Sequence, residues 1–172
     1  SFQLEEEGLD HQASMPDVPG PDELADITKQ DPAYVDQLPE RVQLFLKYRR
    51  PFSVRQVPHD ENSTGKLEPV KHVWMKAVDR LPDDDGLQRA LLAYISDYEL
   101  LGTATLPHGD PRVIRPDLQM ASLDHAMWFH RPARVDEWLL FSFDSPSASG
   151  SRGLARAEIF NQQGVMVAST AQ

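Results

Sequence analysis

The 172-residue sequence contains no cysteine and no apolar run long enough to cross a bilayer. The absence of cysteine excludes thiolate nucleophiles, cysteine-ligated zinc and disulfide bonds, and it is typical of a cytoplasmic protein. A transmembrane helix needs about 20 consecutive apolar residues, and a signal peptide needs a basic segment followed by an apolar one. Neither pattern is present, so we expect a cytoplasmic protein with no membrane span and no signal peptide.

Basic residues are also few, because 17 Lys and Arg stand against 27 Asp and Glu and the formal net charge is −10. A molecule with this charge repels polyanions, which argues against nucleic acid as a partner. The hydrophobic content of 40% is nevertheless that of a protein with a packed core. The length suits one domain, or one domain with an extension.

Several catalytic motifs are missing. There is no G-x-S-x-G nucleophile elbow, since Gly150-Ser151-Arg152-Gly153 has the wrong spacing, and there is no P-loop or G-x-G-x-x-G. The six histidines lack the spacing of metal ligands. We therefore expect no metal and no cofactor, which leaves the chemistry to carboxylate, amide and hydroxyl groups.

The chain divides into a proline-rich, acidic N-terminal part and a region with regular hydrophobic patterns. Residues 5–50 are predicted to be a linker that contains a short helix over 39–48. Alternating apolar residues predict strands over 52–57, 70–78, 118–129, 137–144, 153–160 and 165–171, with the small residues 145–151 as a connection. Three acids, Asp83, Asp84 and Asp85, predict the start of a long helix that ends near Gly102. One helix among antiparallel strands indicates an α+β domain whose sheet wraps the helix.

Asp97 stands out within the predicted helix. At about 100° per residue, one side of the helix carries a polar strip made of Gln88, Arg89, Ser96, Glu99 and Thr103. Asp97 falls on the opposite side, among Ala90, Ala93, Tyr94, Leu100, Leu101 and Ala104. A carboxylate there loses hydration, which costs free energy unless hydrogen-bond donors surround it. The pattern leaves two interpretations open: a functional acid, or a structural acid that pairs with an arginine or caps a loop.

A second acid, Asp124, lies beside His125 in the strand predicted over 118–129. Adjacent strand residues point to opposite faces of a sheet, so these two side chains are not expected to touch each other. We interpret Asp124 as structural.

Several segments together resemble the acyl-CoA thioesterase II (TesB) family: SDYELLGTA at 96–104, SLDHAMWFHRP at 122–132, EWLL at 137–140, SPSASGSRG at 145–153 and GVMVASTAQ at 164–172. The resemblance implies a double-hotdog protein, in which each hotdog is a curved antiparallel sheet around a central helix. Residues 51–172 would form the C-terminal hotdog, and residues 1–4 the last strand of an N-terminal hotdog that is absent from this chain. That N-terminal half is the expected partner, together with a second copy in a homo-oligomer. Without it, we expect a sheet edge and the outer face of the sheet to be exposed.

The resemblance also implies the substrate and the working residues. The substrate would be acyl-CoA, hydrolysed by an activated water held by Asp97, Ser122 and Gln172. Arg112, Arg115 and Arg131 are candidates for contacts with the CoA phosphates. Two alternatives remain: a hotdog hydratase or dehydratase, which needs a histidine and an acid facing the substrate, and a non-catalytic acyl-CoA binding subunit.

Overall fold

A computed structural model describes residues 4, 6–26, 51–59, 67–109 and 118–172 of the chain. The predicted helix at 39–48 and the candidates Arg112 and Arg115 lie outside these ranges. The predicted strand at 1–4 also lies outside them except for Leu4, which is exposed.

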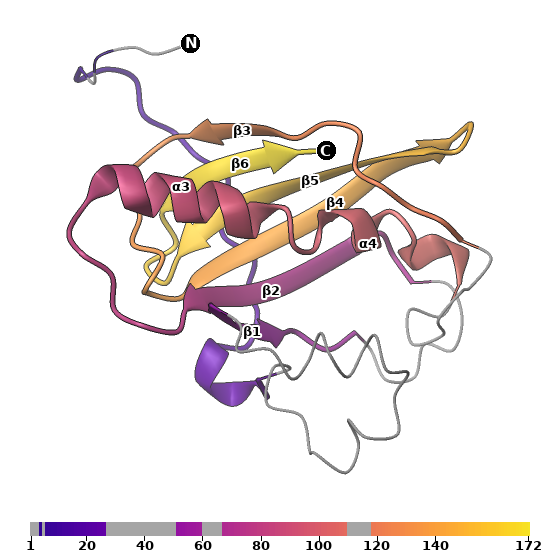
Figure 1. Cartoon of the computed structure of the whole chain (residues 1–172), viewed down its shortest axis with the longest axis horizontal. Coiled ribbons are helices and arrows are strands. Elements are labelled where there is room, and N and C mark those ends of the chain that lie inside the picture. The colour runs from indigo at the N-terminus through magenta and orange to yellow at the C-terminus, as the bar shows by residue number, and fades with distance from the viewer. Residues whose placement is uncertain (1–3, 5, 27–50, 60–66, 110–117) are drawn as a thin grey trace.

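Six strands form one antiparallel sheet in the order β1-β2-β4-β5-β6-β3 (Figure 1). The strands are β1 (Phe52–Gln56), β2 (Val70–Ala77), β3 (Ala126–Phe129), β4 (Leu139–Ser149), β5 (Arg152–Asn161) and β6 (Met166–Ala171). Each falls within or close to a segment of alternating apolar residues, which bury one side of a strand against a core. The predicted α+β arrangement is therefore confirmed.

Two predicted strand boundaries were wrong. β3 begins at Ala126 rather than at residue 118, so the segment before it is not part of the sheet. β4 continues to Ser149, because its partner β5 returns after a turn of only two residues. Gly150 and Ser151 form that turn with φ values of 55° and 60°, the positive angles that both central residues of a type I′ hairpin require.

The helix begins where the three acids predicted it, as α3 (Asp85–Ser96), and the Asp84 side chain accepts a hydrogen bond of 3.0 Å from the backbone N–H of Leu87. The prediction of one continuous helix to Gly102 was wrong. α3 ends at Ser96, and a short α4 (Leu100–Thr103) follows after a break. Lys71 of β2, which is 5% exposed, holds Glu99, the residue that directly precedes α4. Its ammonium group donates hydrogen bonds to the backbone oxygen of Glu99 at 3.1 Å and to the Glu99 carboxylate at 2.7 Å.

The predicted orientation of the helix was also wrong. Gln88, Ser96 and Thr103 are 4%, 0% and 0% exposed, whereas Tyr94 is 57% exposed and the Asp97 side chain 56%. The predicted polar strip therefore faces the sheet in part, and Asp97 lies at the surface of this chain as the residue that caps α3.

Hydrogen bonds explain how these polar side chains tolerate burial. Gln88 accepts a hydrogen bond of 2.7 Å from the backbone N–H of Val135. The Ser96 hydroxyl donates to the backbone oxygen of Ala93 at 2.8 Å. Because these hydrogen bonds satisfy the polar groups of Gln88 and Ser96, both side chains can be buried. The periodicity of polar and apolar residues therefore predicted the wrong side of α3 to face the sheet.

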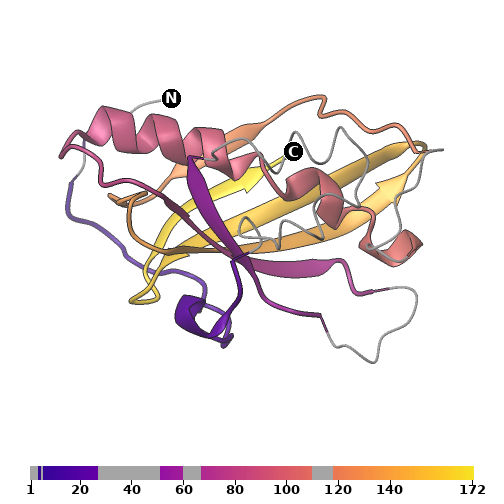
Figure 2. The same cartoon turned by 60° about the horizontal axis from the view of Figure 1, so that its bottom comes forward.

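Hydrophobic cores cover both faces of the sheet. The larger core lies under α3 and includes Leu92, Ile95 and Phe141. On the other face, Met15, Val18 and Leu24 pack against a second cluster, formed by Trp74, Trp138, Leu140 and Phe160. The N-terminal segment 6–26, which contains the 3-10 turn η1 (Pro21–Glu23), thus runs along the side of the sheet away from α3 (Figure 2).

This packing corrects the expectation of an exposed outer face in part, because residues 15–24 of the predicted linker cover that face over Trp74 and Phe160. Arg156 and Glu158 on the outer side of β5 are exposed, as expected. The indole N–H of Trp74 donates to the backbone oxygen of Pro19 at 2.9 Å, which holds this part of the linker against the sheet. Within the described part of the chain, no helix has the length and apolar character needed to cross a membrane.

Candidate functional site

Three segments meet beside the end of α3. Asp97 directly follows α3, Ser122 lies in the segment that leads into β3, and Gln172 directly follows β6. The backbone of Gln172 is held by β5, since it exchanges hydrogen bonds of 2.9 and 3.0 Å with Ala155. The sheet therefore fixes the position from which the Gln172 side chain extends.

The structure brings two of the three predicted site residues into direct contact. The amide Nε2 of Gln172 donates a hydrogen bond to the hydroxyl of Ser122. The third, Asp97, lines the same open hollow as Ser122, between α3 and the segment before β3. This hollow has a volume of about 550 Å³.

His125 lies between these residues. Its Nδ1 is 2.9 Å from Oε1 of Gln172 and 3.9 Å from Oδ1 of Asp97. Its Nε2 is 2.9 Å from the hydroxyl of Ser96 and 3.2 Å from the hydroxyl of Thr170. The imidazole thus connects Asp97 to the Gln172–Ser122 pair.

His125 was not predicted as a site residue, because residues 118–125 were predicted to belong to a strand. The alternation of a strand does not apply there, since β3 begins only at Ala126. The only signal in the sequence was that histidine is often a functional residue. Its contact with Gln172 could not be predicted locally, because the two residues are 47 positions apart. Asp124, which we interpreted as structural, lines the same hollow as Asp97.

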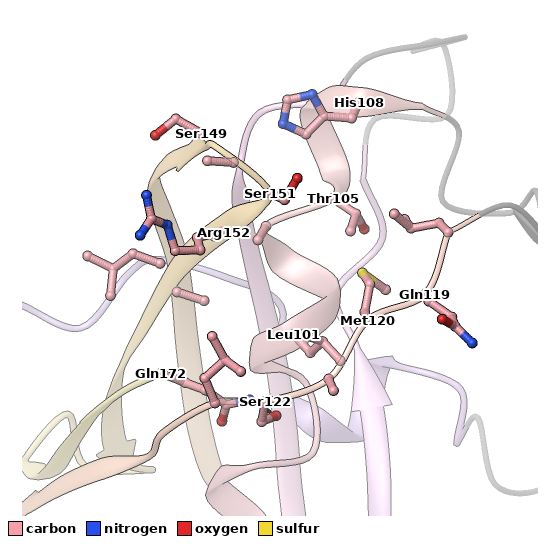
Figure 3. Close-up of a pocket in the computed structure, with 18 of the residues that line it drawn as sticks. Leu101, Thr105, His108, Gln119, Met120, Ser122, Ser149, Ser151, Arg152 and Gln172 are labelled. Carbon is pink, nitrogen blue, oxygen red and sulfur yellow. Dashed lines mark hydrogen bonds between the residues drawn. The ribbon is translucent and has the colours of Figure 1, made fainter.

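A larger cavity of about 980 Å³ extends from Ser122 and Gln172 along α4 and the β4–β5 hairpin (Figure 3). Figure 3 shows the two side chains together at one end, with Arg152 and Ser149 on the hairpin and His108 near the other end. The remaining lining is largely apolar and includes Leu101, Met120, Leu123 and Leu154.

The wall of this cavity depends on a close approach of β5 to the residue that follows α4. A side chain at Gly153 would bring its Cβ within 2.9 Å of the Cβ of Ala104, a distance that real Cβ atoms do not show. Glycine is therefore the residue that allows the hairpin and the helix to share this wall.

The site has the groups needed to hold a water molecule. A carboxylate accepts hydrogen bonds, an amide donates and accepts, and a hydroxyl does both. No three His, Asp or Glu side chains come together as metal ligands among the described residues. Arg131 lies in an ion pair with Asp10 and donates to the backbone oxygen of Met166 at 2.8 Å, so it is already engaged by protein groups.

Comparisons with known proteins agree on one family. The profile of the family described as acyl-CoA thioesterase matches residues 43–172. Acyl-CoA thioesterase 2 of Haemophilus influenzae is 36% identical over 173 residues, which span 100% of this chain and 60% of that protein. A crystal structure of an acyl-CoA thioesterase II, TesB2, from Mycobacterium marinum is 40% identical, with a TM-score of 0.75. That match covers 99% of this chain and 58% of the TesB2 chain.

A crystal structure with the hot dog fold from Alicyclobacillus acidocaldarius is 18% identical, covers 98% of this chain and 56% of that one, and has a TM-score of 0.66. At this identity it supports the fold alone, and with TesB2 it confirms the hotdog fold that the resemblance implied. The chain spans no more than 60% of the length of these similar proteins.

Proposed function

The chain belongs to the acyl-CoA thioesterase family, and from that premise we propose that the complete polypeptide that carries it hydrolyses acyl-CoA to a free acid and CoA. The observation that carries the proposal is the hydrogen bond between Gln172 and Ser122, with Asp97 lining the same hollow as Ser122. Relatives that span the chain are named for this activity.

The proposed reaction needs no covalent intermediate, because a thioester carbonyl is electrophilic and a thiolate leaves readily. Asp97 accepts a proton from a bound water while the water oxygen attacks the carbonyl carbon. The C–S bond then breaks, and the CoA thiolate leaves and takes up a proton. A general base of this kind typically contributes about 10²- to 10⁴-fold to the rate. No cofactor takes part.

Ser122 and Gln172 supply the remaining hydrogen bonds to the water in this proposal. Their mutual hydrogen bond restricts both side chains, so the water meets groups that are already oriented. The larger cavity starts at these two residues and has an apolar lining, which suits the acyl chain or the pantetheine arm of the substrate.

We further propose that an N-terminal hotdog domain completes the site. In this proposal residues 51–172 are the C-terminal hotdog, residues 5–50 the linker, and residues 1–4 the last strand of the other domain. Support comes from the exposed apolar residues near Asp97 and on β3, among them Tyr94, Trp128 and Phe129, at 57%, 53% and 43% exposed. A homo-oligomeric state and a cytoplasmic location remain predictions from the sequence.

One observation favours the hydratase alternative. His125 and Asp97 lie 3.9 Å apart and line the same hollow, which supplies the histidine and the acid that such an enzyme needs. The family assignment favours hydrolysis, and the two reactions have different products.

The experiment follows saturated acyl-CoA substrates of several chain lengths with a thiol reagent, and trans-2-enoyl-CoA by the absorbance of its conjugated thioester. Thiol release from the saturated substrates supports the proposal. Loss of the enoyl absorbance with the thioester intact would instead identify a hydratase. Binding of acyl-CoA without any turnover would identify a non-catalytic subunit.

A further inference from the structure

The His125 ring is anchored by two buried hydroxyl groups. Ser96 at the end of α3 is 0% exposed and Thr170 in β6 is 2% exposed. Their oxygens lie 2.9 and 3.2 Å from Nε2 of the ring. The His125 side chain itself is 27% exposed, so one side of the ring is held within the fold and the other faces the site.

The hydroxyl protons indicate which ring nitrogen carries hydrogen. Ser96 donates its proton to the backbone oxygen of Ala93 at 2.8 Å, and Thr170 donates to that of Ala126 at 2.9 Å. A hydroxyl has one proton, so with these two donations both oxygens offer only lone pairs to His125. In this arrangement Nε2 donates its single N–H between the two hydroxyl oxygens.

The other ring nitrogen, Nδ1, faces the Gln172 amide at 2.9 Å. With Gln172 Oε1 toward the ring, Nδ1 donates its N–H to that oxygen and the Gln172 NH₂ group donates to Ser122. If Nδ1 accepts instead, the amide must turn over, so that its N–H donates to Nδ1 and its oxygen faces Ser122. Oδ1 of Asp97 lies 3.9 Å from the same ring nitrogen.

In both arrangements His125 decides which end of the Gln172 amide faces Ser122. Asp97 is the charged partner of His125 that the described residues provide, since the contacts from α3 and β6 are the uncharged side chains of Ser96, Thr170 and Gln172. We propose that His125 is a positioning residue for the proposed hydrolysis, and that it acts by fixing the orientation of the Gln172 amide relative to Ser122. This inference rests on the proposed function.

Two substitutions of His125 separate positioning from packing. His125→Phe keeps the ring volume but removes both nitrogens, whereas His125→Asn loses volume but keeps an amide where Nδ1 lies. We expect His125→Phe to lower kcat about 10- to 100-fold with KM changed less than about threefold, because a displacement of about 1 Å at a site can cost about 100-fold. We expect the kcat of His125→Asn to be at least about fivefold higher than that of His125→Phe. A residue that only packs predicts the opposite order.

The coupling to Gln172 is tested with a double variant. If His125 acts through Gln172, His125→Phe should lower kcat by less than about twofold in a Gln172→Met background. Full additivity of the two losses would overturn the proposal. His130→Phe is the matched control, since His130 directly follows β3 and its Nε2 lies 2.8 Å from the hydroxyl of Ser169, which is not one of the proposed site residues. Its kcat should stay within about twofold of wild type.

A readout that does not depend on turnover separates this inference from the proposed function. In the complete polypeptide, the two NMR signals of the Gln172 side-chain NH₂ group should move toward the positions of a solvent-exposed glutamine amide in His125→Phe but keep their wild-type positions in His130→Phe. If the wild-type protein released no CoA from acyl-CoA, the proposed function would be wrong. The NMR comparison would still test whether His125 orients the Gln172 amide. If wild type were active and the Gln172 signals were unchanged in His125→Phe, the positioning role would be wrong.

Discussion

At the scale of single residues, Ser122 offers a test of the proposed water site that keeps the fold intact, because it lies outside the strands and is exposed. Ser122→Ala removes the hydroxyl that Gln172 binds and leaves the amide without that partner. We expect kcat to fall about 10-fold, since a hydrogen bond contributes up to about 1.5 kcal/mol and about 1.4 kcal/mol corresponds to a tenfold change in rate. Ser122→Thr retains the hydroxyl and should stay within about threefold of wild type. Equal losses in the two variants, measured by thiol release, would show that the hydroxyl has no role.

His59 and His72 link stability to pH. Burial, followed by the charge of Lys71, lowers the pKa of His59, and burial, followed by His59, lowers the pKa of His72. The unfolded chain therefore takes up protons first as the pH falls below about 6.5. Stability from these groups is present above that pH and is lost as the pH falls toward the lowered folded values.

We expect the double variant His59→Gln/His72→Gln to lose less stability than wild type between pH 7.5 and pH 5.5, measured by urea unfolding at each pH. His11→Gln, a change at an exposed histidine, is the control and should follow wild type. An identical pH dependence in the double variant and wild type would contradict this account.

The residue scale also shows what the sequence could not predict. The chemical type and the family resemblance selected Asp97, Ser122 and Gln172, but the polar pattern gave Asp97 the wrong surroundings. Gln88 and Ser96 are buried because particular backbone groups satisfy them, and such partners are visible only in three dimensions. His125 was missed for the same reason, since its partners come from α3 and β6.

At the scale of elements, the Lys71–Glu99 ion pair fixes the residue that precedes α4 to strand β2, close to the break that carries Asp97. Lys71 also lies 5.5 Å from the ring of Phe143, so the cation has an aromatic neighbour as well. Lys71→Met leaves Glu99 without its partner and should lower the free energy of unfolding by about 3 kcal/mol, the lower end for a broken buried pair, because the Glu99 side chain is 28% exposed.

Chemical denaturation of the Lys71→Met variant measures this loss. The matched variant Lys71→Met/Glu99→Gln removes the unpaired charge and should regain at least about half of the lost stability. If the Lys71→Met variant had the same free energy of unfolding as wild type, the Lys71–Glu99 pair would contribute no stability to the fold.

Strands were predicted better than the helix for a physical reason. Alternation over a strand records which side is buried, and each of the six strands overlaps a segment predicted from it, although β4 extends beyond its predicted segment to Ser149. The residue after the helix break, Glu99, is held by Lys71, 28 residues earlier in sequence, and no local pattern contains that contact. The predicted start of β3 was wrong because the apolar residues that suggested a longer strand, Leu118, Met120 and Leu123, line a cavity instead of pairing in the sheet.

At the scale of the whole molecule, the edge strand β3 carries exposed Trp128 and Phe129, and the outer side of α3 carries exposed Tyr94. An open strand edge with apolar side chains favours association through that edge. We expect this chain, expressed by itself, to sediment as a dimer or larger species at about 50 µM, and Trp128→Lys to shift it toward monomer. A sharp monomer in wild type would show that these residues need no covering partner.

The central claim is that Asp97 activates the water that cleaves the thioester. The most direct measurement is kcat for thiol release from acyl-CoA by the complete polypeptide, compared among wild type, Asp97→Asn and Asp124→Asn. Asp124 is a matched control because it is a carboxylate in the same hollow. We predict a loss of about 10²-fold or more for Asp97→Asn and a change of less than about threefold for Asp124→Asn. An Asp97→Asn variant within about tenfold of wild type would contradict the account.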